Sequence, residues 1–139
     1  MLELTTILKE HNLKVTPQRL SIFRMLRNTT SHPNAEVIYK SLHDEYPTMS
    51  LATVYKTLDT LVKHDLIQQL NVGEDSYRYD ADTHSHPHIK CTSCSKVIDM
   101  YDVKSVLQLR EEVTKLTQFD LSHEQLYFYG ICPDCKGKK

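Results

Sequence analysis

Four cysteines in two identically spaced pairs constrain this chain more than any other feature of its sequence. The pairs are Cys91-x-x-Cys94 and Cys132-x-x-Cys135, and 37 residues (95–131) separate them. Two such pairs supply four thiolates, which form a closed tetrahedral shell that suits Zn²⁺ and leaves no position for a substrate. The sequence therefore predicts one structural zinc per chain, joining distant segments. The alternatives are redox-active dithiols or unliganded thiols.

The start of the chain and its hydropathy indicate a reducing compartment. No stretch approaches the roughly 18 consecutive apolar residues that a membrane helix needs. The segment "MLELTTILKEHNLK" carries acids where a secretory signal has a basic start. We therefore expect a cytoplasmic protein without a membrane partner, in which disulfides are rare and cysteines bind metal.

Length and charge limit the function classes. The chain has 139 residues, 40% of them hydrophobic, which fits one ordinary domain or two small ones. The formal net charge is −1, with 9 basic and 10 acidic residues in 1–80 and 8 of each in 81–139. A prediction of nucleic-acid binding must therefore depend on local charge and on motif.

Cap and stop signals divide the first half of the chain into helices. Thr16, followed by proline, precedes a helix over 17–28, and a second helix is predicted to open at "HP" and to run over 33–46, between two prolines. Ser50 caps a third, "LATVYKTLDTLVKHD", whose apolar residues recur at i, i+3, i+4 and i+7. "LIQQLNV" and "SYRYDAD" flank a "GED" turn and alternate like the strands of a hairpin. This order predicts a winged helix-turn-helix domain over 1–80.

The second half has a different pattern. "HIKC" and "KVIDMY" are strand-like and flank the first cysteine pair, "VKSVLQLREEVTKLTQ" is an amphipathic helix, and "QLYFYGIC" is a β-prone run that leads into the second pair. We predict a hinge over 81–88 and a small dimerisation domain over 89–139. The predicted fold class is α+β: a winged helix-turn-helix followed by a small α/β domain with a four-cysteine zinc site.

Histidines at alternate positions precede the first cysteine pair. On a strand, alternate side chains face one side, so His86 and His88 can converge on one point, with His84 farther away. Asp80 and Asp99 are carboxylates in neighbouring predicted strands. Two imidazoles with carboxylates suit iron, manganese or zinc, a donor set distinct from the thiolates. The alternative is a solvated polar loop.

An enzyme is not expected. His43-Asp44-Glu45 matches the H-x-E of zinc deaminases, but it falls on a predicted helix. In "ICPDC" the proline lies inside the cysteine pair instead of before it. The sequence also has no Gly-rich phosphate loop and no nucleophile elbow.

The third helix is the candidate recognition helix for double-stranded DNA, because its N-terminal end would meet base edges. The candidate DNA contacts on and near it are Ala52, Thr53, Tyr55 and Lys56, together with Lys14 and Arg19 before and on the first helix. Tyr55 also shares the apolar face, so a core position is its alternative. For Lys14, Arg19 and Lys56, the alternative is a solvated charge on the surface without contact to DNA.

Five stretches, "LKVTPQR", "HPNAEVIY", "YPTMSLATVYKTLDTL", "HIKCTSC" and "YGICPDC", resemble in the same order the ferric uptake regulator family of bacterial metal-dependent repressors. The resemblance covers nearly the whole chain. It implies a homodimer with winged helices on palindromic operator DNA and C-terminal domains at the subunit interface. It also implies one regulatory Fe²⁺ or Mn²⁺ per chain, held by His32, Asp80, His86, His88 and Asp99. His32 is included as a ligand only because of the resemblance, since a single histidine before a proline otherwise indicates no more than a helix cap.

The residue at position 99 indicates a branch of the family. Iron-uptake repressors usually carry glutamate there and peroxide-responsive members carry aspartate, so Asp99 predicts a peroxide sensor, with His32 and His86 as the oxidised residues by resemblance. One alternative is a repressor that senses iron or manganese by occupancy alone. A more remote one is a zinc-stapled module that binds protein.

A further metal site is known in some family members. The positions that would supply it are Ser85 and Pro87 here, which argues against it, although His84, His123 and Glu124 keep an alternative open. Lys56 stands where other members carry arginine or asparagine.

Overall fold

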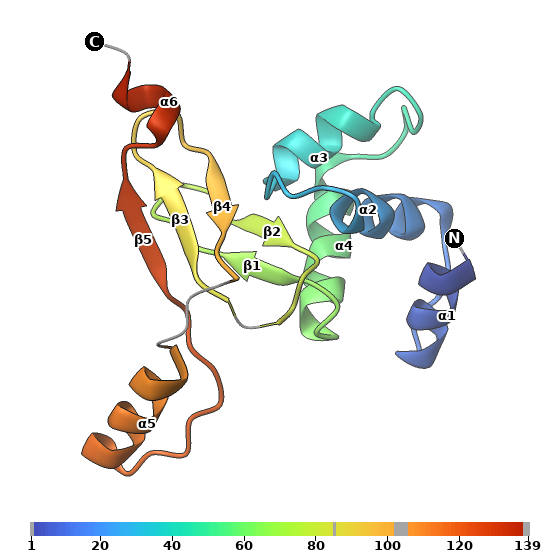
Figure 1. Cartoon of the computed structure of the whole chain (residues 1–139). Helices are drawn as coiled ribbons and strands as arrows, with labels where there is room; N and C mark the ends of the chain where they lie inside the picture. The colour runs from blue at the N-terminus through green and yellow to red at the C-terminus, as the bar shows by residue number, and fades with distance from the viewer. Residues whose placement is uncertain (1, 85, 102–105, 138–139) are drawn as a thin grey trace. The chain divides into compact units, whose positions relative to one another are not determined.

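The computed structural model describes residues 2–84, 86–101 and 106–137. The chain forms two compact units, residues 1–83 and 84–139, and each is described by itself (Figure 1). Among the described residues, no helix is long and apolar enough to cross a membrane.

The N-terminal unit contains four helices, and the last three start at capping side chains. The helices are α1 (Leu2–Glu10), α2 (Pro17–Arg27), α3 (Ala35–Leu42) and α4 (Leu51–Lys63). The caps are Thr16, which accepts a hydrogen bond from the Arg19 backbone N–H (3.1 Å), Asn34 from Val37 (2.9 Å) and Ser50 from Thr53 (3.1 Å). Each cap pairs a backbone N–H that has no partner inside the helix, which stabilises the helix by about 1 kcal/mol.

Apolar side chains at helical spacing fill the space between these helices. The most buried are Leu8, Ile22, Phe23, Leu26, Ile38, Val54, Leu58 and Leu61. Each contributes on the order of 2 kcal/mol through loss of contact with water. This core fixes α4 against α2 and α3, the arrangement of a helix-turn-helix.

A two-stranded hairpin follows α4 and completes the winged helix. Strand β1 (Gln68–Leu70) pairs antiparallel with β2 (Arg78–Asp80), and Gln68 lies opposite Asp80. Gly73, in the turn between them, has a φ of 82°, which few residues other than glycine adopt at low cost. The strands are shorter than the sequence predicts because pairing is confined to three residues on each side.

The C-terminal unit is built on a three-stranded sheet. Its strands are β3 (His88–Cys91), β4 (Val97–Asp99) and β5 (Tyr127–Gly130), in the order β4-β3-β5, with β3 antiparallel to β4 and parallel to β5. A parallel neighbour requires a crossover connection, and α5 (Val106–Thr117) lies within it. The short helix α6 (Pro133–Lys136) follows β5. The predicted α+β class is confirmed.

Helix α5 has no buried residue, unlike α2, α3 and α4. Within its unit it lies beyond the end of the sheet at which β5 begins, whereas α6 lies at the opposite end (Figure 1). Three of its apolar side chains, those of Leu107, Leu109 and Leu116, are exposed in this structure, whereas Val106 and Val113 are half-buried.

Three predicted helix boundaries need correction. The second helix begins at Ala35 instead of 33, because His32 has a φ of 54°, outside the helical region, and Asn34 is the N-cap. It ends at Leu42, before the predicted residue 46, since the chain forms a turn ahead of Pro47. The amphipathic segment predicted from residue 103 is a helix from Val106, and 102–105 lie outside the described residues.

Two helices were not predicted. Helix α1 buries Leu4 and Leu8, four residues apart, a spacing that the sequence offers. Helix α6 is a single turn that begins directly after Cys132, too short for periodicity to reveal.

Candidate metal centres and nucleic-acid interface

The four cysteines come together at one end of the C-terminal sheet. Cys91 ends β3, Cys94 lies in the turn that follows, and Cys132 caps α6, which contains Cys135. The parallel register places Cys91 opposite Gly130, so the chain leaving β5 arrives beside the first pair. All four Sγ atoms lie within 4.8 Å of one another, and no disulfide joins them.

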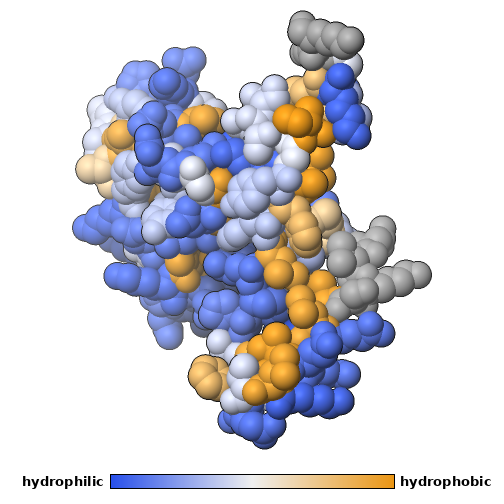
Figure 2. Space-filling view, turned by 90° about the vertical axis from the view of Figure 1, so that its left-hand side faces the viewer, coloured by the Kyte–Doolittle hydropathy of each residue, from blue (hydrophilic) through white to orange (hydrophobic). Residues whose placement is uncertain are grey.

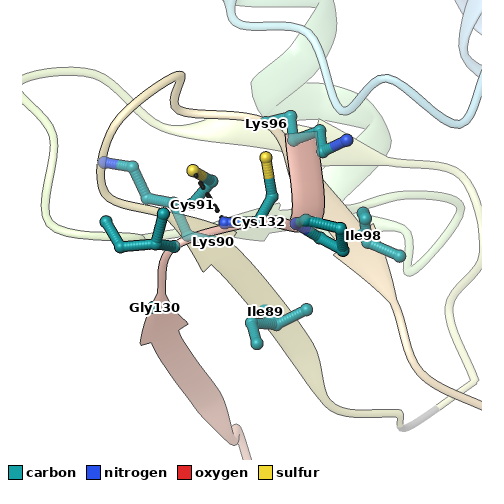
Figure 3. Close-up of a pocket in the computed structure, with 9 residues that line it drawn as sticks. Ile89, Lys90, Cys91, Lys96, Ile98, Gly130 and Cys132 are labelled. Atoms are coloured by element: carbon teal, nitrogen blue, oxygen red, sulfur yellow. Dashed lines mark hydrogen bonds between the residues drawn. The ribbon is translucent and has the colours of Figure 1, made fainter. Parts of the chain in front are cut away.

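Backbone N–H groups converge on the sulfur of Cys91. The amides of Ser93, Cys94 and Cys132 donate to Sγ at 3.4, 3.4 and 3.3 Å. Figure 3 shows the bond from Cys132, with both sulfur atoms pointing the same way from different segments. Hydrogen bonds from the backbone of Cys94 and then of Cys132 lower the pKa of the Cys91 thiol to about 6, so this sulfur is prepared as a thiolate.

The pKa of the Cys135 thiol shifts in the opposite direction from that of Cys91. A hydrogen bond from the Ser93 side chain lowers its pKa, but Cys132, burial and the remaining sulfurs outweigh that effect and raise the pKa to about 12. Four thiolates this close together repel one another unless a metal compensates their charge. In a tetrahedral Zn²⁺ site the sulfurs are roughly 3.8 Å apart. The Sγ atoms of Cys94 and Cys132 are 3.9 Å apart, so the donor set fits zinc.

Two histidines and an aspartate converge in the C-terminal unit. His88 begins β3 and pairs with Asp99, the last residue of β4. The Nε2 atoms of His86 and His88 lie 2.6 and 3.0 Å from the same oxygen, Oδ1 of Asp99. The prediction that alternate histidines face one point thus corresponds to the geometry found, although His86 precedes the strand.

Neighbouring groups orient the His86 ring. Its Nδ1 lies 2.6 Å from the carbonyl oxygen of His84, which can only accept, so Nδ1 donates this bond, and Nε2 is the nitrogen that faces Oδ1 of Asp99 and would give up its proton to bind a metal. Tyr101 stacks on the ring, with centroids 4.8 Å apart. This is the arrangement that a metal-binding histidine needs: one nitrogen pinned by a hydrogen bond and the other presented as a donor.

A second pair of donors lies in the N-terminal unit. The Nε2 atom of His32, in the loop before α3, is 3.3 Å from Oδ2 of Asp80 at the end of β2. The loop is tied to β2, because the Tyr79 backbone N–H donates to Pro33 at 3.0 Å. His32 holds a left-handed φ of 54°, which costs a residue with a Cβ about 1 kcal/mol or more and is tolerated where surroundings impose it.

The donors of both units suit the same kind of metal. Imidazole nitrogens with carboxylate oxygens favour Fe²⁺ and Mn²⁺ over softer ions, and they also accept Zn²⁺. The N-terminal unit offers two such side chains and the C-terminal unit three. Each set has fewer donor side chains than the roughly six coordination positions of an octahedral ion.

The further-site alternative receives no support among the described residues. The Nδ1 of His123 contacts the Ser122 hydroxyl at 2.9 Å, and Glu124 forms an ion pair with Arg110. In the described part of the chain, none of His84, His123 and Glu124 belongs to a cluster of three donor side chains. Ser85 lies outside the described residues.

The predicted DNA contacts lie on the surface of the N-terminal unit. Ala52, Thr53 and Lys56 are exposed near the start of α4, and Tyr55 is 38% exposed, which argues against the core position considered for it. Lys14 is exposed too. Arg19 is half-buried and donates from one guanidinium nitrogen to the Lys14 carbonyl at 2.7 Å, so it also supports the segment before α2.

Residue-by-residue reasoning missed three participants. His32 came only from the resemblance, and its left-handed backbone has no sequence signal. Tyr101 was not considered as a support for His86. Gln68, which lies opposite Asp80 in the hairpin register, was also not considered.

The fold and the donor sets define a winged-helix protein with two kinds of side-chain cluster that could hold a metal, one of thiols and one of imidazoles and carboxylates. A profile of the ferric uptake regulator family matches residues 10–129. The chain is 52% identical over 138 residues to the transcriptional regulator PerR of Clostridium acetobutylicum, covering 99% of each. It therefore belongs to the ferric uptake regulator family, which confirms the predicted family.

Solved structures agree. The ferric uptake regulator of Helicobacter pylori, described as having three functional metal binding sites, matches with a TM-score of 0.80 and 27% identity, covering 96% of this chain and 89% of that one. The Campylobacter jejuni peroxide stress regulator matches with a TM-score of 0.76 and 34% identity, covering 94% and 98%.

Proposed function

We propose that this protein is a metal-dependent transcriptional repressor that binds palindromic operator DNA as a homodimer and senses hydrogen peroxide through histidines of its regulatory site. The observation that carries the proposal is the convergence of His86 and His88 on Asp99. An aspartate at this position, in a chain 52% identical to a protein named PerR, favours the peroxide-responsive branch.

The regulatory ion would be shared by the two units. His32 and Asp80 would supply donors from the DNA-binding unit, and His86, His88 and Asp99 from the other. An ion that needs both sets binds only a closed arrangement, and by linkage it stabilises that arrangement by its differential binding free energy. Loss of the ion would release the DNA-binding units from the spacing that fits an operator.

The DNA-binding surface would be the exposed N-terminal half of α4. Ala52, Thr53, Tyr55 and Lys56 would meet base edges in the major groove, and Lys14 and Arg19 would contact phosphates. With a net charge of −1 the chain has no general attraction for DNA, so binding would depend on these local contacts. Because its target would be chromosomal DNA, the protein would act in the cytoplasm. Its activity would be DNA binding and not catalysis.

The homodimer would form through the C-terminal units. Figure 2 shows hydrophobic residues gathered over β5 and α5. We call these two elements the β5–α5 surface; the exposed large hydrophobic residues on them or directly after them, each at least 44% exposed, are Leu107, Leu109, Leu116, Phe119, Phe128, Tyr129 and Ile131. So many exposed apolar side chains are unusual for a monomer. A second copy is the occupant we propose, because operator symmetry requires two DNA-binding units.

Peroxide sensing would use the donors themselves. Ferrous iron in this site would supply one-electron reduction of hydrogen peroxide next to its ligands. His32 and His86 would each gain one oxygen atom from one molecule of hydrogen peroxide, whose other oxygen leaves as water; the imidazole ring would supply the two electrons overall by returning one electron to the iron. An oxidised imidazole is a poorer donor, so the closed arrangement and DNA affinity would be lost.

Binding to an A/T-rich inverted repeat, measured with and without Fe²⁺ or Mn²⁺ and then after peroxide, tests this function. We expect metal-dependent binding in both cases and peroxide release from the iron form alone. Equal release from both metal forms would indicate sensing by occupancy, the alternative that shares this donor set. Absence of binding to the repeat under every condition would leave a protein-interaction module.

A further inference from the structure

Two hydrogen bonds hold the chain that leaves β2 within the N-terminal unit, one to β1 and one to the end of β2. The side-chain Nε2 of Gln68 donates to the backbone carbonyl of Asp82 at 2.6 Å. The backbone N–H of Asp82 in turn donates to Oδ1 of Asp80 at 2.9 Å. Gln68 and Asp80 lie directly opposite each other in the antiparallel register, so the loop closes over a single cross-strand pair.

These bonds determine how the Asp80 carboxylate is presented. The bond to Oδ1 is a local side-chain turn of the kind that aspartate forms with the residue two positions later. With Oδ1 held, the planar carboxylate directs Oδ2 elsewhere, and Oδ2 is the oxygen 3.3 Å from Nε2 of His32. The orientation of the ligand oxygen therefore depends on where the Asp82 backbone lies.

We propose that Gln68 is a positioning residue for the regulatory metal: by holding the Asp82 backbone it fixes the Asp80 carboxylate, so that Oδ2 is presented beside His32. This inference rests on the proposed function, in which Asp80 is a ligand. Gln68 acts through the backbone and does not bind the metal. Groups that orient a ligand in this way commonly change metal affinity 10- to 100-fold.

Four substitutions, two of them also combined in a double variant, isolate this role. Gln68→Leu removes the donor at nearly constant volume, and Gln68→Lys retains a donor of similar reach. Gln69→Leu is the matched control, because Gln69 is the next residue on β1, points to the opposite face of the hairpin and pairs with Tyr79. Asp80→Ala, alone and combined with Gln68→Leu, reports whether the effect passes through the ligand.

Two measurements are made on the zinc-containing protein. Hydrogen exchange of the Asp82 amide, followed by NMR without regulatory metal, reports the local bond. Competition with a chelator gives the Mn²⁺ affinity, free of peroxide chemistry. We expect Gln68→Leu to speed Asp82 exchange and to weaken Mn²⁺ binding about tenfold. Gln68→Lys should recover most of that affinity, Gln69→Leu should change neither quantity, and Gln68→Leu should add nothing to Asp80→Ala.

The outcomes separate this inference from the proposed function. If Asp80→Ala weakens Mn²⁺ binding while Gln68→Leu matches Gln69→Leu, the positioning role is overturned and the site stands. A lower melting temperature for Gln68→Leu with unchanged Mn²⁺ affinity also overturns it, because Gln68 is then only structural. If Asp80→Ala has no effect on affinity, the proposed metal site itself fails, and with it this role for Gln68.

Discussion

The backbone N–H of Cys132 donates a hydrogen bond to Sγ of Cys91 at 3.3 Å, although 41 positions separate the two residues in the chain. The bond joins the end of β3 to the start of α6. A metal at this point therefore fixes the first and last strands of the unit to each other, across the crossover that contains α5.

The first prediction concerns the structural zinc. Each chain should retain one Zn²⁺ after dialysis against a mild chelator, and Cys91→Ser or Cys132→Ser should lose it and unfold the C-terminal unit, because structural zinc supplies on the order of 10 kcal/mol of folding free energy. Native mass spectrometry and circular dichroism are the measurements. Lys136→Ala, beside Cys135, is the control and should keep its zinc. A folded, zinc-free protein with four titratable thiols would contradict the prediction.

The second prediction concerns base recognition. Tyr55 is 38% exposed, so Tyr55→Ala should change the free energy of unfolding by less than about 1 kcal/mol. It should weaken operator binding by about 1–3 kcal/mol while leaving binding to random DNA nearly unchanged. Fluorescence anisotropy on both DNAs is the measurement. Equal losses on the two would assign Tyr55 to general affinity.

The third prediction concerns phosphate contacts. Lys14→Ala should reduce the slope of log affinity against log salt concentration by about 1, on operator and random DNA alike, because one fewer phosphate is neutralised. Lys115→Ala, on α5 in the other unit, removes the same charge and should leave the slope unchanged. An unchanged slope for Lys14→Ala would place this lysine away from the DNA.

Local signals predicted a large part of this fold. Ser50 and the apolar periodicity behind it placed the start of α4 at Leu51, although the helix ends at Lys63, two residues before the predicted end, and the two cysteine pairs located the four-cysteine cluster, because both depend on short-range spacing. Strand alternation predicted that His86 and His88 converge, and both approach Asp99, although only His88 lies on a strand. These features need no knowledge of the rest of the chain.

Other features depend on contacts between distant segments and were not predictable from the residues. The left-handed backbone of His32 depends on the pairing of its loop with β2. In that pairing the Tyr79 N–H donates to the carbonyl of Pro33, which lies 46 positions earlier in the chain. The bond from Gln68 to Asp82 requires the hairpin register. The amphipathic pattern of α5 predicted a helix correctly, but not that its apolar face would remain uncovered within one chain.

The fourth prediction concerns the β5–α5 surface. Leu116 is 84% exposed in a single chain, so Leu116→Glu should cost the isolated chain little and should disfavour a dimer that covers it. We expect light scattering to show a dimer for the parent protein and a concentration-dependent shift to monomer for the variant. Val37→Glu, at an exposed apolar position on α3, is the matched control and should remain dimeric. A dimeric Leu116→Glu would place the interface elsewhere.

The last prediction concerns the sensing chemistry. After brief exposure to peroxide, the iron-loaded protein should gain one oxygen atom on each of His32 and His86, the imidazoles that we propose as ligands of the regulatory ion, and should release the operator. The manganese-loaded protein should bind DNA and resist, since Mn²⁺ does not readily reduce peroxide. Peptide mass spectrometry locates the oxygen.

The variant Asp99→Glu lengthens the side chain that contacts both His86 and His88, at 2.6 and 3.0 Å. It should separate metal binding from oxidation: Mn²⁺-dependent DNA binding should be retained, and oxidation of the iron form should be slower. Oxygen on the cysteines alone, or equal DNA release from both metal forms, would remove peroxide chemistry from the site and leave metal occupancy as its signal.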